Sequence, residues 1–223
     1  MPRGKRFLLG FGLLAVTACT AQTGTVERPP TDVVAENLQP AQGERGAWTY
    51  LDPNVDLKTY TRFILERPKV YGGSGSSYPS NLSQQDREDI AGYFVNETKA
   101  ALEPKYPVVT EPGPDVARLR YTLIGVEQTV PYASTATRLI PVGAAINMVS
   151  SAAGGGGTLT GSVTYAVEGI DSESGKIVAA GVRRLTPGAF DLSSTLGTKE
   201  TARAVARDAA AKLRARLDAL HAS

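Results

Sequence analysis

The sequence has one cysteine and one histidine among its 223 residues. A single cysteine excludes a disulfide within the chain. With a single histidine as well, the chain lacks the usual parts of zinc sites and of Ser-His or Cys-His nucleophile systems. The histidine, His221, is the third residue from the C-terminal end, where we expect a frayed terminus. We therefore expect no catalytic residue, no metal site and no cofactor.

A large charge of either sign is also missing, because 24 Lys and Arg residues face 22 Asp and Glu residues. Proteins that bind nucleic acids usually concentrate basic side chains, since neutralising phosphates supplies much of their affinity. No such concentration precedes the C-terminal segment, which excludes nucleic acid as an expected partner. Hydrophobic residues make up 42% of the chain and charged ones 21%, as in folded domains.

No apolar run reaches the roughly 20 residues of a membrane-spanning helix. The run at residues 7–16 follows the basic residues Arg3, Lys5 and Arg6 and precedes small residues, which is the layout of a cleavable secretory signal. Removal of residues 1–18 takes the three basic residues away and changes the formal charge from +2 to −1.

The end of this signal resembles the lipobox of bacterial lipoproteins, with the residues Val16, Thr17, Ala18 and Cys19. The resemblance implies cleavage between Ala18 and Cys19 and acylation of Cys19 on its sulfur and its amine, with palmitate-type chains. Two or three acyl chains anchor a protein stably because each buried methylene contributes roughly 0.8 kcal/mol. Thr20, rather than an aspartate, follows the cysteine, which in this class implies the outer membrane, with the domain facing the periplasm.

Residues 19–45 are polar, rich in Pro and Gln, and lack apolar periodicity, which predicts a lipidated cysteine followed by a flexible tether. Residues 46–223 are expected to form one domain. Helical periodicity begins at Ser83, where Asp86 completes a capping box, and ends before Pro104. A second helix begins near Thr198, and its predicted apolar stripe consists of Ala202, Val205, Ala209, Leu213, Leu217 and Leu220. The expected strands lie at residues 60–70, 107–110, 117–130, 158–170 and 177–185, and the last two form a hairpin. The strand at 117–130 alternates, and its side with Arg118, Arg120, Thr122 and Ile124 is expected to be wet. This order predicts an α+β domain with a mainly antiparallel sheet packed by two principal helices.

Several short segments of the chain are similar to a known family. They are Asp56-Leu57-Lys58-Thr59-Tyr60, Leu82-Ser83-Gln84-Gln85-Asp86-Arg87, Glu111-Pro112-Gly113-Pro114, Arg118-Leu119-Arg120, Gly161-Ser162-Val163 and Asp171-Ser172-Glu173-Ser174-Gly175. In this order they resemble the Gram-negative lipoprotein family catalogued as domain of unknown function 3313. The family has no established catalytic residues, so the resemblance implies none here.

Three other features suggest chemistry at first sight. The run Gly154 to Gly157 lacks the lysine that a phosphate-binding loop needs after its last glycine, so a hinge before a strand is favoured. The first turns of a helix contain Asp86, Glu88 and Asp89, whose negative charges are stabilised there by the positive end of the helix dipole. The apolar stretch at residues 139–153 is interpreted as a core-covering helix or, alternatively, a surface for a partner or a membrane.

These observations predict a non-enzymatic envelope lipoprotein that binds another protein or an envelope component. Two alternatives stay open. A carboxylate-dependent hydrolase of peptidoglycan or glycan would require convergent acids in a deep cleft. An accessory protein that carries lipid would require an apolar cavity between the sheet and the helices.

Overall fold

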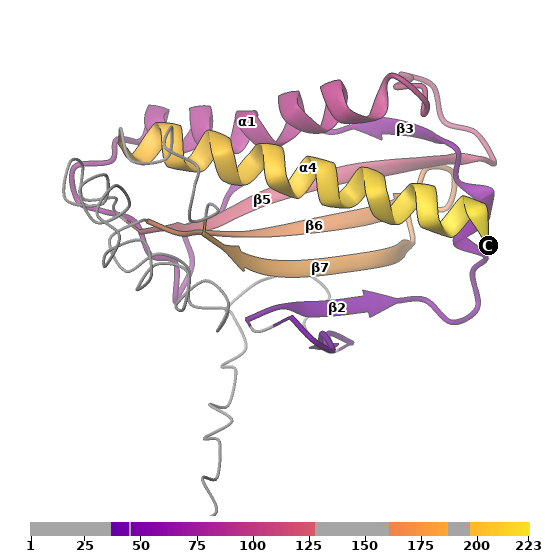
Figure 1. The fold of residues 1–223 in the computed structure, drawn as a ribbon, viewed down its shortest axis with the longest axis horizontal. Helices are drawn as coiled ribbons and strands as arrows, with labels where there is room; N and C mark the ends of the chain where they lie inside the picture. Colours follow the sequence, from indigo (N-terminus) through magenta and orange to yellow (C-terminus); the bar gives the residue numbers. More distant parts are fainter. Residues whose placement is uncertain (1–36, 45, 128–160, 187–196) are drawn as a thin grey trace, which may run out of the picture.

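The computed structural model describes residues 37–44, 46–127, 161–186 and 197–223. They form one α+β domain with a mixed, mostly antiparallel sheet, which confirms the expected fold class. Helices α1 (Gln84–Leu102) and α4 (Thr198–Ala222) lie side by side on one face of the sheet (Figure 1). The strand order is β1-β2-β7-β6-β5-β3, and β4 also pairs with β5.

Three long strands form the centre of the sheet: β5 (Val116–Val126), β6 (Val163–Asp171) and β7 (Ile177–Leu185). Strand β6 lies between the other two and is antiparallel to both. The turn between β6 and β7 holds Gly175 at φ +71°, a left-handed conformation that glycine adopts without a steric penalty. The predicted hairpin is therefore confirmed. Strand β2 (Trp48–Leu51) pairs with β7, and β1 (Gln39–Pro40) pairs with β2.

The strand expected at residues 60–70 is divided into two short strands, β3 (Arg62–Leu65) and β4 (Lys69–Val70). Both run parallel to β5, and Pro68 lies between them because it has no amide hydrogen to give to the ladder. A short 3-10 helix, η1 (Leu57–Thr59), precedes β3. The prediction of a strand at residues 107–110 is wrong, because in that segment only Val108 forms an isolated bridge, to Phe63.

Helix α1 begins as its sequence predicts. Ser83 accepts a hydrogen bond from the amide of Asp86, and the carboxylate of Asp86 accepts one from the amide of Ser83. This reciprocal capping box satisfies two amides that the helix itself leaves unpaired. None of the helices in the described ranges is long and apolar enough to cross a bilayer.

The main core lies between the helices and the sheet. Its centre is a group of aromatic rings: Phe94 of α1 packs on Tyr165 at 4.5 Å and on Tyr121 at 5.6 Å between ring centroids. The hydroxyl groups of Thr98 and Tyr121 lie 2.8 Å apart in this core, so neither polar group is buried without a partner.

A second, smaller core covers the far face of the sheet. There Leu38 is buried against Ile124 and Val182, with Trp48 and Tyr50 packed beside them. Two sequence predictions are corrected by this core. Ile124 lies on the face of β5 that was expected to be wet, and the tether expected to run to residue 45 ends earlier, since Leu38 and β1 belong to the fold. A single buried leucine lacks the periodicity that would have revealed it.

Candidate apolar binding pocket

A cavity of about 220 Å³ lies between the C-terminal half of α4 and the sheet. Its walls come from segments far apart in the sequence, namely α4, the helix-facing sides of β5, β6 and β7, the strand β2, and η1. In Figure 1, β7 and β2 continue the sheet beyond the strands that lie nearest the two helices. The lining is mostly apolar, and its main aliphatic members are Leu51, Leu57, Leu119, Val167, Leu185, Ala209, Leu213, Leu217 and Leu220.

Small residues in the sheet explain why this space is not filled. Gly169 of β6 and its partner Ala179 of β7 face the cavity, and Gly181 follows two positions later on the same face. Side chains on one face of a strand recur every second residue, so three small residues at neighbouring positions leave a hollow in the sheet surface.

Helix α4 changes from buried to half-exposed along its apolar stripe. Ala202, Val205 and Ala209 in its first half are buried, as the predicted stripe requires. Leu213 and Leu217 in its second half remain partly exposed, although they continue the same stripe. Across the cavity Leu51 is 59% exposed. Large apolar side chains that line a concave surface without filling it are typical of a ligand site.

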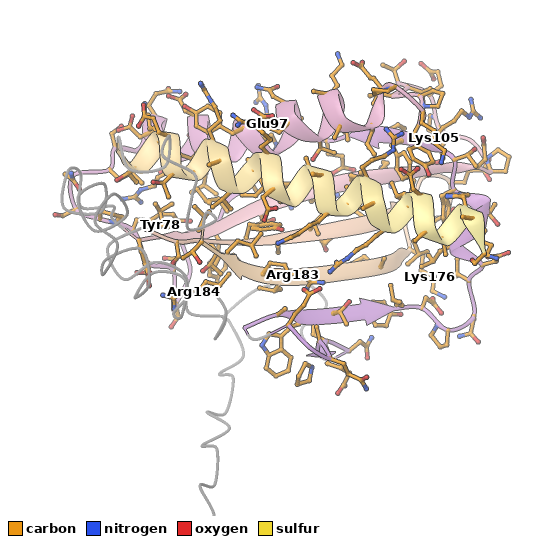
Figure 2. The ribbon with its side chains drawn as sticks, in the orientation of Figure 1. Tyr78, Glu97, Lys105, Lys176, Arg183 and Arg184 are labelled. Carbon is orange, nitrogen blue, oxygen red and sulfur yellow. The ribbon has the colours of Figure 1, made fainter. Side chains whose placement is uncertain are left out.

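The charged residues that line the pocket are three cations, Arg183, Arg216 and Lys212, and one carboxylate, which lie at its mouth. Arg183 of β7 is buried on the face of the sheet that faces α4 (Figure 2), and Arg216 extends from α4. Glu44, from the turn between β1 and β2, binds both: one carboxylate oxygen lies 3.0 Å from Nε of Arg183, and the other contacts Arg216. Burial lowers the pKa of Arg183, and the charge of Glu44 opposes that shift. Nη1 of Arg183 also donates to the carbonyl of Trp48 at 2.8 Å.

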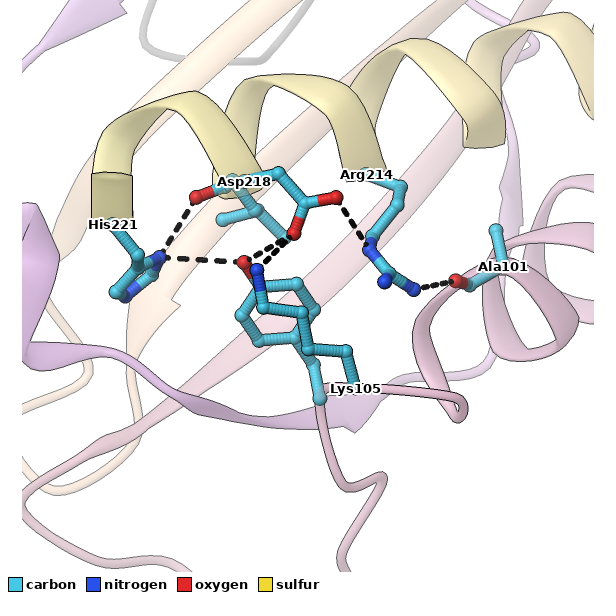
Figure 3. A network of polar contacts seen from close by, with 7 residues as sticks. Ala101, Lys105, Arg214, Asp218 and His221 are labelled. Atoms are coloured by element: carbon cyan, nitrogen blue, oxygen red, sulfur yellow. Dashed lines mark hydrogen bonds and ion pairs between the residues drawn. The ribbon is translucent and has the colours of Figure 1, made fainter. Parts of the chain in front are cut away.

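A polar network fixes the end of α4 and with it one wall of the pocket (Figure 3). The carboxylate of Asp218 accepts from Lys105 at 2.6 Å, from the hydroxyl of Tyr106 at 2.9 Å and from Arg214 at 2.9 Å. Arg214 in turn donates to the carbonyl of Ala101, at the end of α1. The hydrogen bond from Lys105 is the main cause that lowers the pKa of Asp218 to about 2.

His221 is part of the same region, so the expectation of a frayed terminus is wrong. Its Nδ1 lies 2.8 Å from the carbonyl of Leu217 and its Nε2 lies 3.2 Å from the carbonyl of Lys58. Its ring also lies beside that of Tyr106. These contacts tie the last turn of α4 to η1, and the position of the residue in the sequence gave no sign of them.

The acidic residues at the start of α1 serve the fold. Asp86 caps the helix and lies 2.5 Å from Nζ of Lys199, and Asp89 lies 3.2 Å from the same nitrogen. Lys199 stands in the first turn of α4, so these ion pairs join the starts of the two helices. The hydrogen bond from Lys199 is the main cause that lowers the pKa of Asp86 to about 2. Glu88 is exposed and accepts a hydrogen bond from Gln84.

A second pair of acids lies on the opposite face of the sheet. Glu66 and Glu168 share Arg120, at 2.6 Å and 3.7 Å, and burial raises the pKa of Glu168. Arg120 holds both acids away from the pocket. Among the described residues that line the pocket, Glu44 is the only acid. In the same ranges, no three His, Cys, Asp or Glu side chains converge as a metal-binding group.

The remaining sequence candidates lie outside the described residues. They are the lipobox with Cys19, the apolar stretch at 139–153 and the glycine run at 154–157. The pocket itself was missed by sequence reasoning as a site, although a signal was present: alternate small residues in the hairpin stand opposite a leucine stripe in the last helix.

Comparison with known proteins gives a family match and remote structural likenesses. The profile of the family described as "Protein of unknown function (DUF3313)" matches residues 31–213. No curated protein matches the chain. A solved structure of the PelC dodecamer from Paraburkholderia phytofirmans is 9% identical, with a TM-score of 0.40, covering 77% of this chain and 95% of that one.

Two other solved structures are also similar. A putative neuraminyllactose-binding hemagglutinin homologue from Helicobacter pylori is 11% identical, with a TM-score of 0.32, covering 80% of this chain and 87% of that one. A DUF4136 family protein from Bacteroides thetaiotaomicron VPI-5482 is 12% identical, with a TM-score of 0.32, covering 83% and 97%.

Proposed function

Since this chain belongs to the family described as protein of unknown function DUF3313, which supplies no activity, we propose from its own residues that it is a non-enzymatic binding module of the cell envelope. Its ligand is an apolar molecule, or the apolar part of a lipid, that enters the pocket beneath α4. The module is anchored through Cys19 in the outer membrane and faces the periplasm.

The observation that carries this proposal is the unfilled apolar pocket. Its volume of about 220 Å³ exceeds the roughly 150 Å³ of an engineered apolar cavity that binds benzene. Binding sites for small molecules are concave and mostly apolar, with a few polar groups that orient the ligand. Glu44, Arg183 and Arg216 are such groups at the mouth.

The pocket favours the lipid-carrying form of this function over the hydrolase alternative. A lipid carrier requires an apolar cavity between sheet and helices, and this cavity has that position. A glycoside hydrolase requires two carboxyl groups that face each other across the scissile bond. The described lining offers Glu44 alone, and both its oxygens are bound by arginines.

The pocket is tested with N-phenyl-1-naphthylamine, a neutral dye that fluoresces when it enters an apolar site. We expect the chain from residue 19, with Cys19→Ser in place of the acylated cysteine, to bind the dye saturably with one site. Leu217→Gln should weaken binding strongly because it places an amide in the pocket wall. Ala215→Gln, on the exposed side of the same helix, is the matched control. Absence of saturable binding would contradict the proposal.

The anchor is tested by mass spectrometry of the mature N-terminus together with membrane fractionation. The native protein should begin at an acylated Cys19 and follow the outer membrane, whereas Cys19→Ala should abolish acylation and membrane retention. An unmodified N-terminus on a freely soluble native protein would contradict the proposed anchor. The proposed binding in the pocket would then still be tested by the dye titration.

A further inference from the structure

Arg183, one of the two arginines at the mouth, is held more firmly than the carboxylate beside it. Arg183 is buried and fixed by the carbonyl groups of Trp48 and Val182, at 2.8 Å and 3.2 Å. Glu44 stands on a turn, and 43% of its side chain is exposed. Its ion pair with Arg216 joins two exposed side chains, and such surface pairs are weak. The cation is therefore a fixed part of the pocket, while its anionic partner is exchangeable.

A buried guanidinium needs an anion or other hydrogen-bond acceptors both when the pocket is empty and when it holds a ligand. Here each oxygen of Glu44 serves one arginine, Arg183 on the sheet and Arg216 on the helix. A free carboxylate has the same two oxygens in the same plane and would satisfy both arginines in the same way. Glu44 thus occupies the place that an acidic head group would take.

The apolar lining continues directly from this pair of cations. Leu213 and Leu220 lie three residues before and four residues after Arg216, and both line the pocket. Positions at this spacing share a side of a helix. A molecule with its acid at Arg183 and Arg216 would have its chain on the leucines.

We propose that the pocket takes an alkyl carboxylic acid, whose carboxylate replaces Glu44 between Arg183 and Arg216 while its alkyl chain lies under α4. This inference rests on the proposed function, because it names the class of ligand for the same pocket. Glu44 then acts as an internal competitor that covers the arginines when the pocket is empty.

The experiment compares decanoate with 1-decanol, which has the same chain and no charge, as competitors of N-phenyl-1-naphthylamine. It uses the chain from residue 19 with Cys19→Ser, at pH 7.5 and below the critical micelle concentration. Since a hydrogen bond to a charged group contributes more than a neutral one, decanoate should bind about tenfold more tightly than 1-decanol. Decyl phosphate forms a third arm, which distinguishes a phosphate head from a carboxylate.

Variants separate the head group from the pocket. Glu44→Gln should strengthen decanoate binding, because it removes the competitor, and should leave 1-decanol unchanged. Arg216→Gln, at an exposed position, should weaken decanoate binding about tenfold and again leave 1-decanol unchanged. Arg207→Gln, on an exposed side of α4 that does not line the pocket, should change neither.

The outcomes distinguish the inference from the function on which it rests. Equal affinities for decanoate and 1-decanol, unchanged by both variants, would overturn the acidic head group and leave the apolar pocket standing. Tighter binding of decyl phosphate than of decanoate would overturn the choice of a carboxylate. If none of the three displaces the dye, or the dye itself does not bind, the inference and the proposed function both fail.

Discussion

Replacement of Ala179 by leucine tests whether the space beneath α4 is empty. Ala179 faces the cavity from β7, between its strand partners Gly169 and Leu51. Leucine adds three carbons, each of which contributes about 0.8 kcal/mol when buried. Loss of side-chain freedom subtracts about 0.5 to 1 kcal/mol. We therefore expect Ala179→Leu to raise the free energy of unfolding by about 1.5 kcal/mol.

The assay is urea unfolding followed by circular dichroism, together with a dye titration of the same sample. Ala179→Leu should be more stable than the parent and should bind N-phenyl-1-naphthylamine more weakly, because the added side chain occupies the site. Ala215→Leu, at an exposed position of α4, is the matched control and should alter both quantities little.

The opposite sign of the stability change would refute this reasoning. If the region were already close-packed, the larger side chain would force its neighbours aside and destabilise the protein by about 1 to 3 kcal/mol. A stabilised variant that still binds the dye with full affinity would show that the dye binds elsewhere.

Three further predictions concern the parts of the fold that hold the pocket. Acidification should destabilise the protein, because the pKa of Asp218 is about 2 in the folded state, below its ordinary value of about 3.9. The stability that Asp218 contributes is therefore complete above its ordinary pKa and is lost as the pH falls toward 2. In Asp218→Asn, the free energy of unfolding should depend less on pH between pH 5 and pH 2. Tyr121→Phe leaves the buried hydroxyl of Thr98 without this partner and should lower the free energy of unfolding in urea by about 1 to 2 kcal/mol; an unchanged value would mean that the pair contributes nothing. Ser83→Ala removes one half of the capping box with Asp86 and should cost about 1 kcal/mol in the same assay, with Ser83→Asp as the variant that restores the cap.

The helices and the central strands could be predicted because each has a local cause in the sequence. The capping residues Ser83 and Asp86 fixed the start of α1, and the alternation around Tyr121 and Tyr165 identified β5 and β6. The parallel pairing of β3 with β5 could not be predicted, because no local pattern records which distant strand is the neighbour.

The site was less accessible to sequence reasoning than the fold. The apolar stripe of α4 was recognised, but whether Leu213 and Leu217 are covered depends on what lies across from them in space. The small residues Gly169, Ala179 and Gly181 act only because the sheet places them together. Glu44 was assigned to the tether, so its contact with Arg183 and Arg216 was invisible in the sequence.

The most direct test of the central claim, that the space beneath α4 is a binding site, is a titration of the isotope-labelled chain with decanoate followed by amide chemical shifts. Saturable shifts should gather on the C-terminal half of α4 and on the facing residues of β7, including Leu217 and Ala179. Shifts that are absent at saturating decanoate, or that gather on the far face of the sheet around Glu168, would contradict it.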